Sequence, residues 1–178
     1  MKEIGLTRGY VAFVDDDDYD CISSHKWHVY RICTGNKEYV YPRTTLSKTH
    51  SDGYKWKREV LMHRFIMSAA PDQIVDHVNG NTLDCRRDNL RICTSAENSW
   101  NAHKSKLING KPTISEYKGL RFDPRNKTNP WTAHISVNKK RIYLGKFKTE
   151  EEAALMYDVG SFIYHGKFGK PNFCKIVA

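Results

Sequence analysis

The sequence predicts an α+β fold, in which strands and helices occupy separate stretches of the chain. Short β-like runs fill the first 58 residues, and apolar and polar residues alternate regularly over residues 131–137. Two helix-capping motifs, at Thr94 and Thr149, each open a stretch of helical character. The hydrophobic content of 39% in 178 residues is sufficient for packed cores.

The composition excludes a membrane-spanning chain and favours a polyanionic partner. No run approaches the roughly 18 apolar residues that a spanning helix needs, and residues 1–5 lack the pattern of a signal peptide, so we expect no membrane and a cytoplasmic location. The formal net charge is +9. Residues 115–178 hold 12 Lys and Arg against 6 Asp and Glu, so most of the excess lies in the C-terminal third.

The first 58 residues predict a small N-terminal β subdomain. Polar turns separate its β-like runs, which occupy residues 10–14, 27–30 and 39–41. The acidic run from Asp15 to Asp18 leaves two interpretations, a metal-binding cluster or a solvated turn. In a strand these carboxylates would point to opposite faces, and no nearby His or spaced Glu completes a cation cage. The pattern therefore favours the turn.

Residues 59–104 form the second predicted unit. An apolar stretch that contains His63 and Arg64 ends at Pro71, and a strand then leads into the pair Asp76 and His77. The capping box at residues 94–97 predicts a helix that begins at Ser95 and continues through Asn98 toward Lys104. Residues 105–115 are polar, basic and rich in turn formers, which predicts a linker.

Residues 116–178 form the third predicted unit. The alternation over residues 131–137 places Trp131 and Ile135 on one face of a strand, and the next strand places Arg141 and Tyr143 on the face opposite Ile142 and Leu144. That face is basic and aromatic. A second capping box at residues 149–152 opens a helix that Gly166 ends, with Ala153, Tyr157, Gly160 and Tyr164 at helical spacing.

The stretch around Asp76 and His77 has the residue types that phosphodiester hydrolysis requires. The reaction needs an activated water, a general base and a cation that stabilises the developing charge. His77 can supply the base, because an unperturbed imidazole is largely deprotonated at neutral pH. Asp76 and the Asn98 amide are hard oxygen ligands suited to Mg²⁺ or Mn²⁺. The five cysteines form no CxxC pair, so we expect reduced thiols and no structural zinc.

These residues resemble the HNH endonucleases of the ββα-metal fold, in particular the homing endonucleases of phages and introns. The resemblance covers about residues 60–103 and implies that His77 is the general base and that Asp76 and Asn98 bind one divalent ion. It implies further that Asn89 braces the loop that carries His77, and that His63 has a supporting role. Many relatives carry two zinc-binding CxxC pairs, and this chain has none.

Residues 116–173 resemble the Apetala-type DNA-binding domain, a three-stranded antiparallel sheet packed on one helix. The marks of the resemblance are residues 116–121, 131–135, 144–147, 149–154 with 157–158, and 171–173. It implies that the outer sheet face enters the major groove, with contacts from Lys118, Arg121, Arg141 and Tyr143. Lys139 and Lys140 at the hairpin tip are expected to touch phosphate. Asp123, His134 and Ser136 depart from the plant pattern, so the plant target sequence is not transferable.

The leading hypothesis is a metal-dependent, site-specific homing or nicking endonuclease that acts on double-stranded DNA in a bacterial or phage-infected cell. One active site per chain favours nicking by a monomer or weak dimer. Two alternatives stay open. The first is a non-catalytic, sequence-specific DNA-binding regulator that keeps the nuclease fold as a scaffold, and the second is a nuclease for structured RNA.

Overall fold

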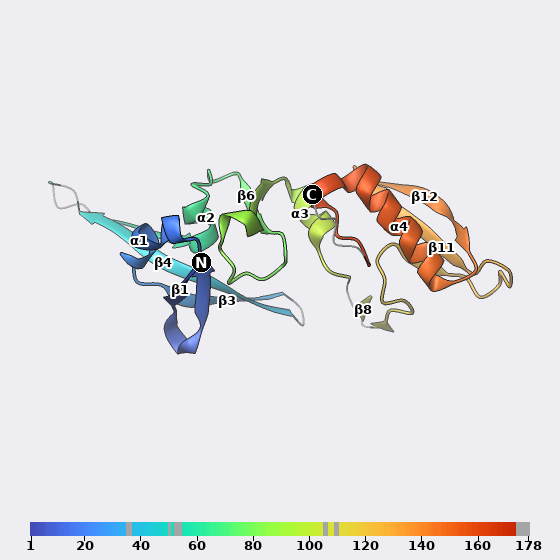
Figure 1. Ribbon diagram of the computed structural model, residues 1–178, viewed down its shortest axis with the longest axis horizontal. Coiled ribbons are helices and arrows are strands. Elements are labelled where there is room, and N and C mark those ends of the chain that lie inside the picture. The colour runs from blue at the N-terminus through green and yellow to red at the C-terminus, as the bar shows by residue number, and fades with distance from the viewer. Residues whose placement is uncertain (35–36, 50, 52–54, 105–106, 109–110, 174–178) are drawn as a thin grey trace. The chain divides into compact units, whose positions relative to one another are not determined.

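The computed structural model describes residues 1–34, 37–49, 51, 55–104, 107–108 and 111–173, and the predicted linker lies partly outside them, as does Cys174. The chain divides into two compact units, Met1–Thr94 and Ser95–Ala178 (Figure 1). Both contain helices and antiparallel sheets, so the α+β class predicted from the sequence is confirmed.

The first unit is built on a strand hairpin and a three-stranded antiparallel meander. The hairpin consists of β1 (Lys2–Gly5) and β2 (Val11–Val14), and α1 (Asp16–Ser23) packs against β1. The meander consists of β3 (His28–Thr34), β4 (Lys37–Thr49) and β5 (Lys55–Leu61), with β4 in the centre. The N-terminal part is therefore rich in β structure, as its β-like runs predict.

A short helix and a second hairpin complete the first unit. They comprise α2 (Met62–Ile66), β6 (Ile74–His77), the 3₁₀ turn η2 (Arg87–Asn89) and β7 (Leu90–Cys93). Strand β6 is antiparallel to β7. Buried apolar side chains from the β1–β2 hairpin, α1, α2, the β6–β7 hairpin and their connections form one core: Ile4, Leu6, Ala12, Val14, Ile22, Trp27, Met62, Ile66, Val75, Cys85 and Leu90. The β6–β7 hairpin is thereby fixed on the same core as the N-terminal strands.

The prediction of a solvated turn at Asp15–Asp18 is wrong. Asp15 precedes helix α1, and the next three carboxylates lie in its first turn. Carboxylates at that place are stabilised by the positive end of the helix dipole, which the strand-based interpretation left out. Asp15 and Asp18 also bind Arg87, far away in the sequence. The acidic run is therefore the start of a helix, and two of its carboxylates bind Arg87.

The second unit contains a three-stranded antiparallel sheet covered by one long helix. The sheet has the order β10 (Leu120–Phe122), β11 (Trp131–Val137), β12 (Lys140–Phe147), and α4 (Glu150–His165) lies across one face of it (Figure 1). The unit also contains α3 (Ser95–Asn101), the two-residue strands β8 (Leu107–Ile108) and β9 (Lys111–Pro112), and the turn η3 (Gly166–Phe168). The predicted start of α3 at Ser95 is confirmed.

Glycine allows the close approach between α4 and the sheet. A Cβ atom added to Gly160 would lie 2.8 Å from Leu144 Cδ1, and one added to Gly119 would lie 1.9 Å from the Tyr157 ring. The capping box is formed as predicted, since Thr149 accepts from the Glu152 amide. Tyr164 differs from the prediction, because its side chain is 42% exposed rather than on the buried face. No helix in the described part of the chain is long and apolar enough to span a membrane.

Candidate functional site

His77 ends strand β6, and its side chain lies inside the first unit with only 5% of its surface exposed. The preceding residue, Asp76, pairs in register with Arg91 of β7. Arg91 donates to one oxygen of Asp76, Oδ2, from Nε at 3.0 Å and from Nη2 at 2.7 Å. The hairpin register thus fixes a carboxylate and an imidazole on consecutive residues, with a guanidinium against the carboxylate.

Three rings gather around this point, and one of them was missed by sequence reasoning. The centroids of His63 and His77 lie 4.9 Å apart in an edge-to-face arrangement. Tyr41, from the central strand β4, lies 5.5 Å from His63 and 6.2 Å from His77. No local motif marks Tyr41, because only the fold of the meander brings β4 beside the hairpin. His63, expected to have a supporting role, is next to the predicted base.

Burial keeps both imidazoles neutral. Desolvation lowers the pKa of His77 to about 4, although the charges of Asp76 and Asp84 act in the opposite direction. Desolvation, the neighbouring His77 and Arg64 lower the pKa of His63 to about 3. The Nδ1 atom of His63 is buried and has no hydrogen-bond partner among the described residues. At neutral pH His77 is therefore unprotonated.

Asn89 holds the loop that follows His77. Its Oδ1 accepts from the Asn79 amide at 2.9 Å, and its Nδ2 donates to the Asp84 carbonyl at 2.7 Å. Its own carbonyl accepts from the Val78 amide at 2.8 Å. One buried side chain thus ties the start and the end of the loop together, which is the geometry expected of the bracing residue.

Asp84 gives the loop a second internal support. Its carboxylate accepts from Asn79 Nδ2 at 2.8 Å and from the Arg86 guanidinium at 2.7 Å. The Arg86 hydrogen bond lowers the pKa of Asp84, so this carboxylate stays ionised at neutral pH. Gly80, with φ +77°, allows the tight turn just after His77.

The N-terminal elements support the loop from outside. Arg87 donates from Nε and Nη2 to the two oxygens of Asp18 at 2.8 and 2.7 Å, and its amide donates to Asp15. Phe13 of β2 exchanges backbone hydrogen bonds with Leu83 and Cys85. The strand hairpin and α1 thus belong to the framework of the loop.

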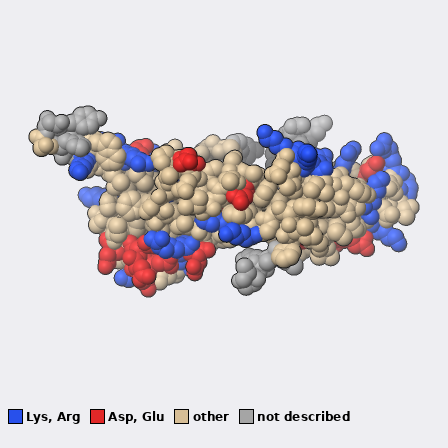
Figure 2. Space-filling model, turned by 90° about the horizontal axis from the view of Figure 1, so that it is seen from above, with Lys and Arg blue, Asp and Glu red and all other residues tan. Residues whose placement is uncertain are grey.

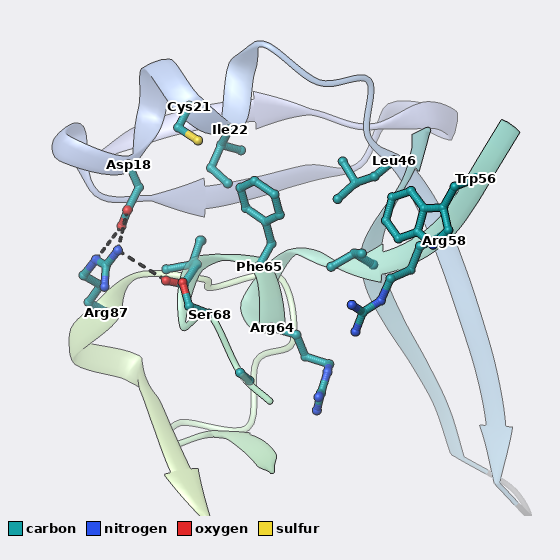
Figure 3. Close-up of a pocket in the computed structure, with 13 residues that line it drawn as sticks. Asp18, Cys21, Ile22, Leu46, Trp56, Arg58, Arg64, Phe65, Ser68 and Arg87 are labelled. Carbon is teal, nitrogen blue, oxygen red and sulfur yellow. Dashed lines mark hydrogen bonds and ion pairs between the residues drawn. The ribbon is translucent and has the colours of Figure 1, made fainter. Parts of the chain in front are cut away.

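A cavity of about 460 Å³ opens beside the Arg87 and Asp18 ion pair (Figure 3). Figure 3 shows Phe65, Trp56 and Arg58 around it, with Arg64 below. Arg64 donates to the carbonyls of Ala70 and Gln73 at 2.6 Å. Neither Asp76 nor His77 lines this cavity, so it is separate from the predicted catalytic residues.

The predicted metal ligand Asn98 lies on α3, in the second unit, where it is exposed. Asp76 belongs to the first unit. The described residues contain no group of three or more His, Cys, Asp and Glu side chains that could hold a metal ion. The predicted ligand set has only two members, one carboxylate and one amide, so it does not form a group of three.

The outer face of the second sheet, opposite α4, carries basic and aromatic side chains. His134 pairs with Tyr143, and Ser136 pairs with Arg141. The His134 and Tyr143 rings lie 6.0 Å apart, and Tyr143 is 58% exposed. Burial and the charges of Arg141 and Arg121 lower the pKa of His134. Both arginines therefore lie close to His134, as the predicted contact face requires.

A β-bulge adds a basic residue that the alternation does not predict. The register shifts between Ala133 and His134, so Leu144 has no partner of its own on β11, and Lys146 pairs with Thr132, which also pairs with Arg121. Without the bulge, Lys146 would share the face of Ile142 and Leu144. With it, Arg121, Thr132 and Lys146 occupy one row across the sheet.

The other predicted DNA contacts differ in how accessible their charges are. Asn138 and Lys139, with φ of 50° and 64°, form the tip of the β11–β12 hairpin and are exposed, as is Lys140. The Lys118 ammonium instead donates to the Trp100 carbonyl at 2.7 Å, and burial lowers the pKa of Lys118 to about 8. Lys118 is thus engaged inside the second unit.

Two surface features accompany these sites. A hollow of about 870 Å³ is lined by residues of α3, β11 and α4, among them Ser99, Trp100, His134, Tyr157 and His165. Acidic side chains gather in one patch in Figure 2, at the position along the long axis that α1 occupies in Figure 1. Asp16 and Asp17, in the first turn of α1, are exposed acidic side chains of the first unit.

Residues 60–100 match the HNH endonuclease family. This stretch contains α2, the β6–β7 hairpin, η2 and nearly all of α3. The chain carries an HNH nuclease domain. The protein is therefore an enzyme, a nuclease, and a nuclease domain implies a DNA substrate.

Two viral proteins are similar over most of this nuclease. An uncharacterized HNH endonuclease of Acanthamoeba polyphaga mimivirus is 27% identical over 175 residues, which cover 95% of this chain and 78% of that protein. Protein 3.8 of Escherichia phage T7 is 27% identical over 130 residues, which cover 70% of this chain and 98% of the phage protein.

Plant proteins match a smaller part of the nuclease. An ethylene-responsive transcription factor-like protein of Arabidopsis thaliana is 47% identical over 47 residues, which cover 26% of this chain and 20% of the plant protein. The match concerns a segment of both proteins and does not extend to the whole of either.

HNH nucleases generally depend on a divalent metal, and the chemistry of the predicted donors fits one. Mg²⁺ binds through one or two hard oxygen ligands and keeps several waters, so a carboxylate and an amide are sufficient protein ligands. Asp76 supplies a negatively charged carboxylate, whose Oδ2 accepts two hydrogen bonds from Arg91. The residues present are therefore compatible with a hydrated divalent ion.

Proposed function

We propose that this nuclease is a metal-dependent, site-specific DNA endonuclease of the homing or nicking type. The observation that carries the proposal is the placement of His77: a neutral imidazole ends a strand, directly after a carboxylate, at the start of a loop held by Asn89. A general base needs a fixed position and an available lone pair at neutral pH, and this arrangement supplies both.

In the proposed reaction, His77 accepts a proton from a water molecule as the water oxygen forms a bond to phosphorus. The bond between phosphorus and the 3′ oxygen breaks, the leaving 3′ oxygen takes up a proton from solvent, and the products are a 5′-phosphate and a 3′-hydroxyl. Asp76 and Asn98 would hold Mg²⁺ or Mn²⁺, which stabilises negative charge on the phosphate and the leaving oxygen. His63 and Tyr41 keep the His77 ring in place and exclude water from its buried side.

DNA recognition is assigned to residues 116–178, as an Apetala-type domain joined by a linker at residues 105–115 to the nuclease core at residues 59–104. The partial match to plant transcription factors supports this assignment, as does the basic outer face of the second sheet. On that face Arg121, Arg141, Tyr143 and Lys146 would contact DNA, with Lys139 and Lys140 at the phosphates. The hollow beside α3 would carry the strand past the helix that bears Asn98.

The test is conversion of supercoiled plasmid to open-circle and linear forms, with Mg²⁺ or with EDTA, followed by sequencing of the ends. The His77→Ala variant should lose about 10²- to 10⁴-fold in nicking rate, the usual contribution of a general base. His28→Ala, on β3, is the matched control and should cut like the parent protein.

Binding is measured on the same variants, so that cutting and DNA contact are separated. His77→Ala should keep its affinity for duplex DNA. Undiminished cutting by His77→Ala would remove His77 from the mechanism. Retained binding without any cutting by the parent protein, over a pooled phage-genome substrate with Mg²⁺ and with Mn²⁺, would instead identify a non-catalytic regulator. Preferential cleavage of RNA would assign the alternative substrate.

A further inference from the structure

The outer face of α4 is apolar although it packs on nothing in the described part of the chain. Leu155, Val159, Phe162 and Ile163 are 52%, 51%, 61% and 65% exposed. Their spacing places them in one row along the helix, opposite the buried face that packs on β11 and β12. Single exposed apolar residues are ordinary, but a continuous row of four large ones marks an interaction surface.

A hollow adjoins this row. It has a volume of about 540 Å³ and is lined by Phe147, Leu155, Met156 and Val159 among others, all within the second unit. Phe162 projects from the same helix about two turns further on. The surface therefore offers both a protruding aromatic ring and an apolar hollow, which are the two halves of a complementary contact.

The charges at the two ends of α4 favour one orientation of a partner helix. Glu150, Glu151 and Glu152 form its first turn, and Lys167 and Lys170 follow its last turn. A second copy of α4 running antiparallel brings the acidic end of each helix to the basic end of the other, whereas a parallel copy brings like charges together.

The order of residues along the row is also self-complementary. With a two-fold axis at Val159, Leu155 of one copy lies opposite Ile163 of the other, since each is four residues from the axis. Met156, at the hollow, lies opposite Phe162, and Glu151 lies opposite Lys167. A two-fold interface requires that one surface be complementary to itself, whereas contact with a different protein does not require it.

We propose that the outer face of α4 is a homodimer interface, in which two chains pair antiparallel about Val159 and Phe162 of each enters the hollow of the other. A single helix pair buries an area at the low end of stable interfaces, so the dimer forms at high protein concentration. If the proposed function holds, such a dimer has two nuclease domains and can cut both strands.

The proposal is tested on the full chain by sedimentation velocity over a wide concentration range, with no nucleic acid and no metal, so that failure of the nuclease assignment cannot affect the result. The parent protein should show a concentration-dependent rise in mass toward twice the monomer. Val159→Glu and Phe162→Glu should stay monomeric. Ile114→Glu is the matched control, since Ile114 is 77% exposed and lies outside α4, and it should dimerise like the parent.

Charge reversal tests the orientation. Glu151→Lys alone and Lys167→Glu alone should each weaken the dimer, and the double variant should restore it, because both contacts of an antiparallel pair are then inverted. In a parallel pair each of these positions faces its own copy, so neither single variant would weaken association relative to the parent. Thermal melts accompany each variant, and unchanged melting temperatures exclude misfolding as the cause of a lost dimer.

Two outcomes would overturn the proposal. One is a parent protein that stays monomeric at its highest attainable concentration. The other is a Val159→Glu variant whose mass curve matches the parent while its melting temperature falls, which would mean that a segment of the same chain covers the helix.

Discussion

The loop after His77 and the outer face of the second sheet differ in how their side chains are held. The loop has little regular structure. Asn89 holds it through hydrogen bonds to backbone groups, and the Asp84 carboxylate accepts from the Asn79 side chain. The sheet face is held by the strand ladder behind it, and Arg121, Arg141 and Tyr143 stay exposed. A catalytic side chain must be fixed in place, whereas a DNA-binding surface needs exposed side chains that can extend to the bases and phosphates. Substitutions should therefore affect turnover in the first region and affinity in the second.

Loss of the Asn89 clamp should give the largest effect. Asn89→Ala leaves the Asn79 amide and the Asp84 carbonyl without their partner, at a cost of about 1–3 kcal/mol in stability. A displacement of His77 on the order of 1 Å should lower the nicking rate about 10²-fold. Plasmid nicking and urea unfolding measure the two effects.

Asn126 provides the control for this prediction. Its Oδ1 accepts from the amides of Thr128 and Asn129, the same chemistry in the other unit. Asn126→Ala should leave the nicking rate per bound complex unchanged. Equal losses of turnover in both variants would refute the special role of the clamp.

Removal of Arg91 should have the next largest effect, and it should depend on the metal. Arg91→Gln leaves the mostly buried Asp76 carboxylate without its guanidinium, which costs about 3 kcal/mol. A divalent ion bound to Asp76 offsets part of that loss. Melting curves in EDTA and in Mg²⁺ should therefore differ more for Arg91→Gln than for the parent.

Arg43→Gln is the matched control, because Arg43 pairs with Glu59 in the same unit but Glu59 is 59% exposed. Its loss should be at most about 1 kcal/mol and should not respond to Mg²⁺. A metal response of the same size in both variants would show that the ion does not act at Asp76.

On the sheet face, Arg141→Ala should weaken DNA binding by about 1–3 kcal/mol if its guanidinium contacts a base. Lys146→Ala should lower the slope of affinity against salt by about 1 if its ammonium contacts a phosphate. Fluorescence anisotropy over a salt series measures both, with the exposed Arg125→Ala as the charge-matched control. Normal nicking of bound DNA is expected in each variant. Unchanged affinity of Arg141→Ala would remove the outer face from DNA recognition.

The smallest effect is expected at the brace from α1. Asp18→Asn weakens the ion pair with Arg87, whose side chain is 55% exposed, so the loss of stability should be about 1 kcal/mol and smaller at high salt. Urea unfolding at two salt concentrations provides the measurement. A loss that does not change with salt would assign the effect to helix α1 rather than to the ion pair.

Regular elements of this protein could be predicted from its sequence, and long-range contacts could not. The capping box at Thr149 and the alternation from Trp131 to Val137 are local patterns, and both elements formed where the patterns placed them. Helix α1 and the bulge at Leu144 are exceptions, because the strand-based interpretation of Asp15–Asp18 left out the helix dipole and because strict alternation was carried through Gly145.

In the candidate site too, local patterns could be predicted and long-range contacts could not. The spacing of Asp76, His77 and Asn89 predicted a nuclease, and the family match confirms that class. Tyr41 and the Asp18 contact could not be predicted, because they come from elements distant in sequence. The catalytic, metal and DNA-contact roles of individual residues stay predictions until the variants above are measured.

The ion pair between Asp18 and Arg87 has a consequence for folding kinetics. The two residues are 69 positions apart, and the entire β3–β5 meander lies between them. Closing so long a segment costs chain entropy before any contact forms, so this bond is expected after the local hairpins have assembled. In a refolding experiment, far-UV circular dichroism should recover first, and nicking activity should return later, when α1 reaches the loop.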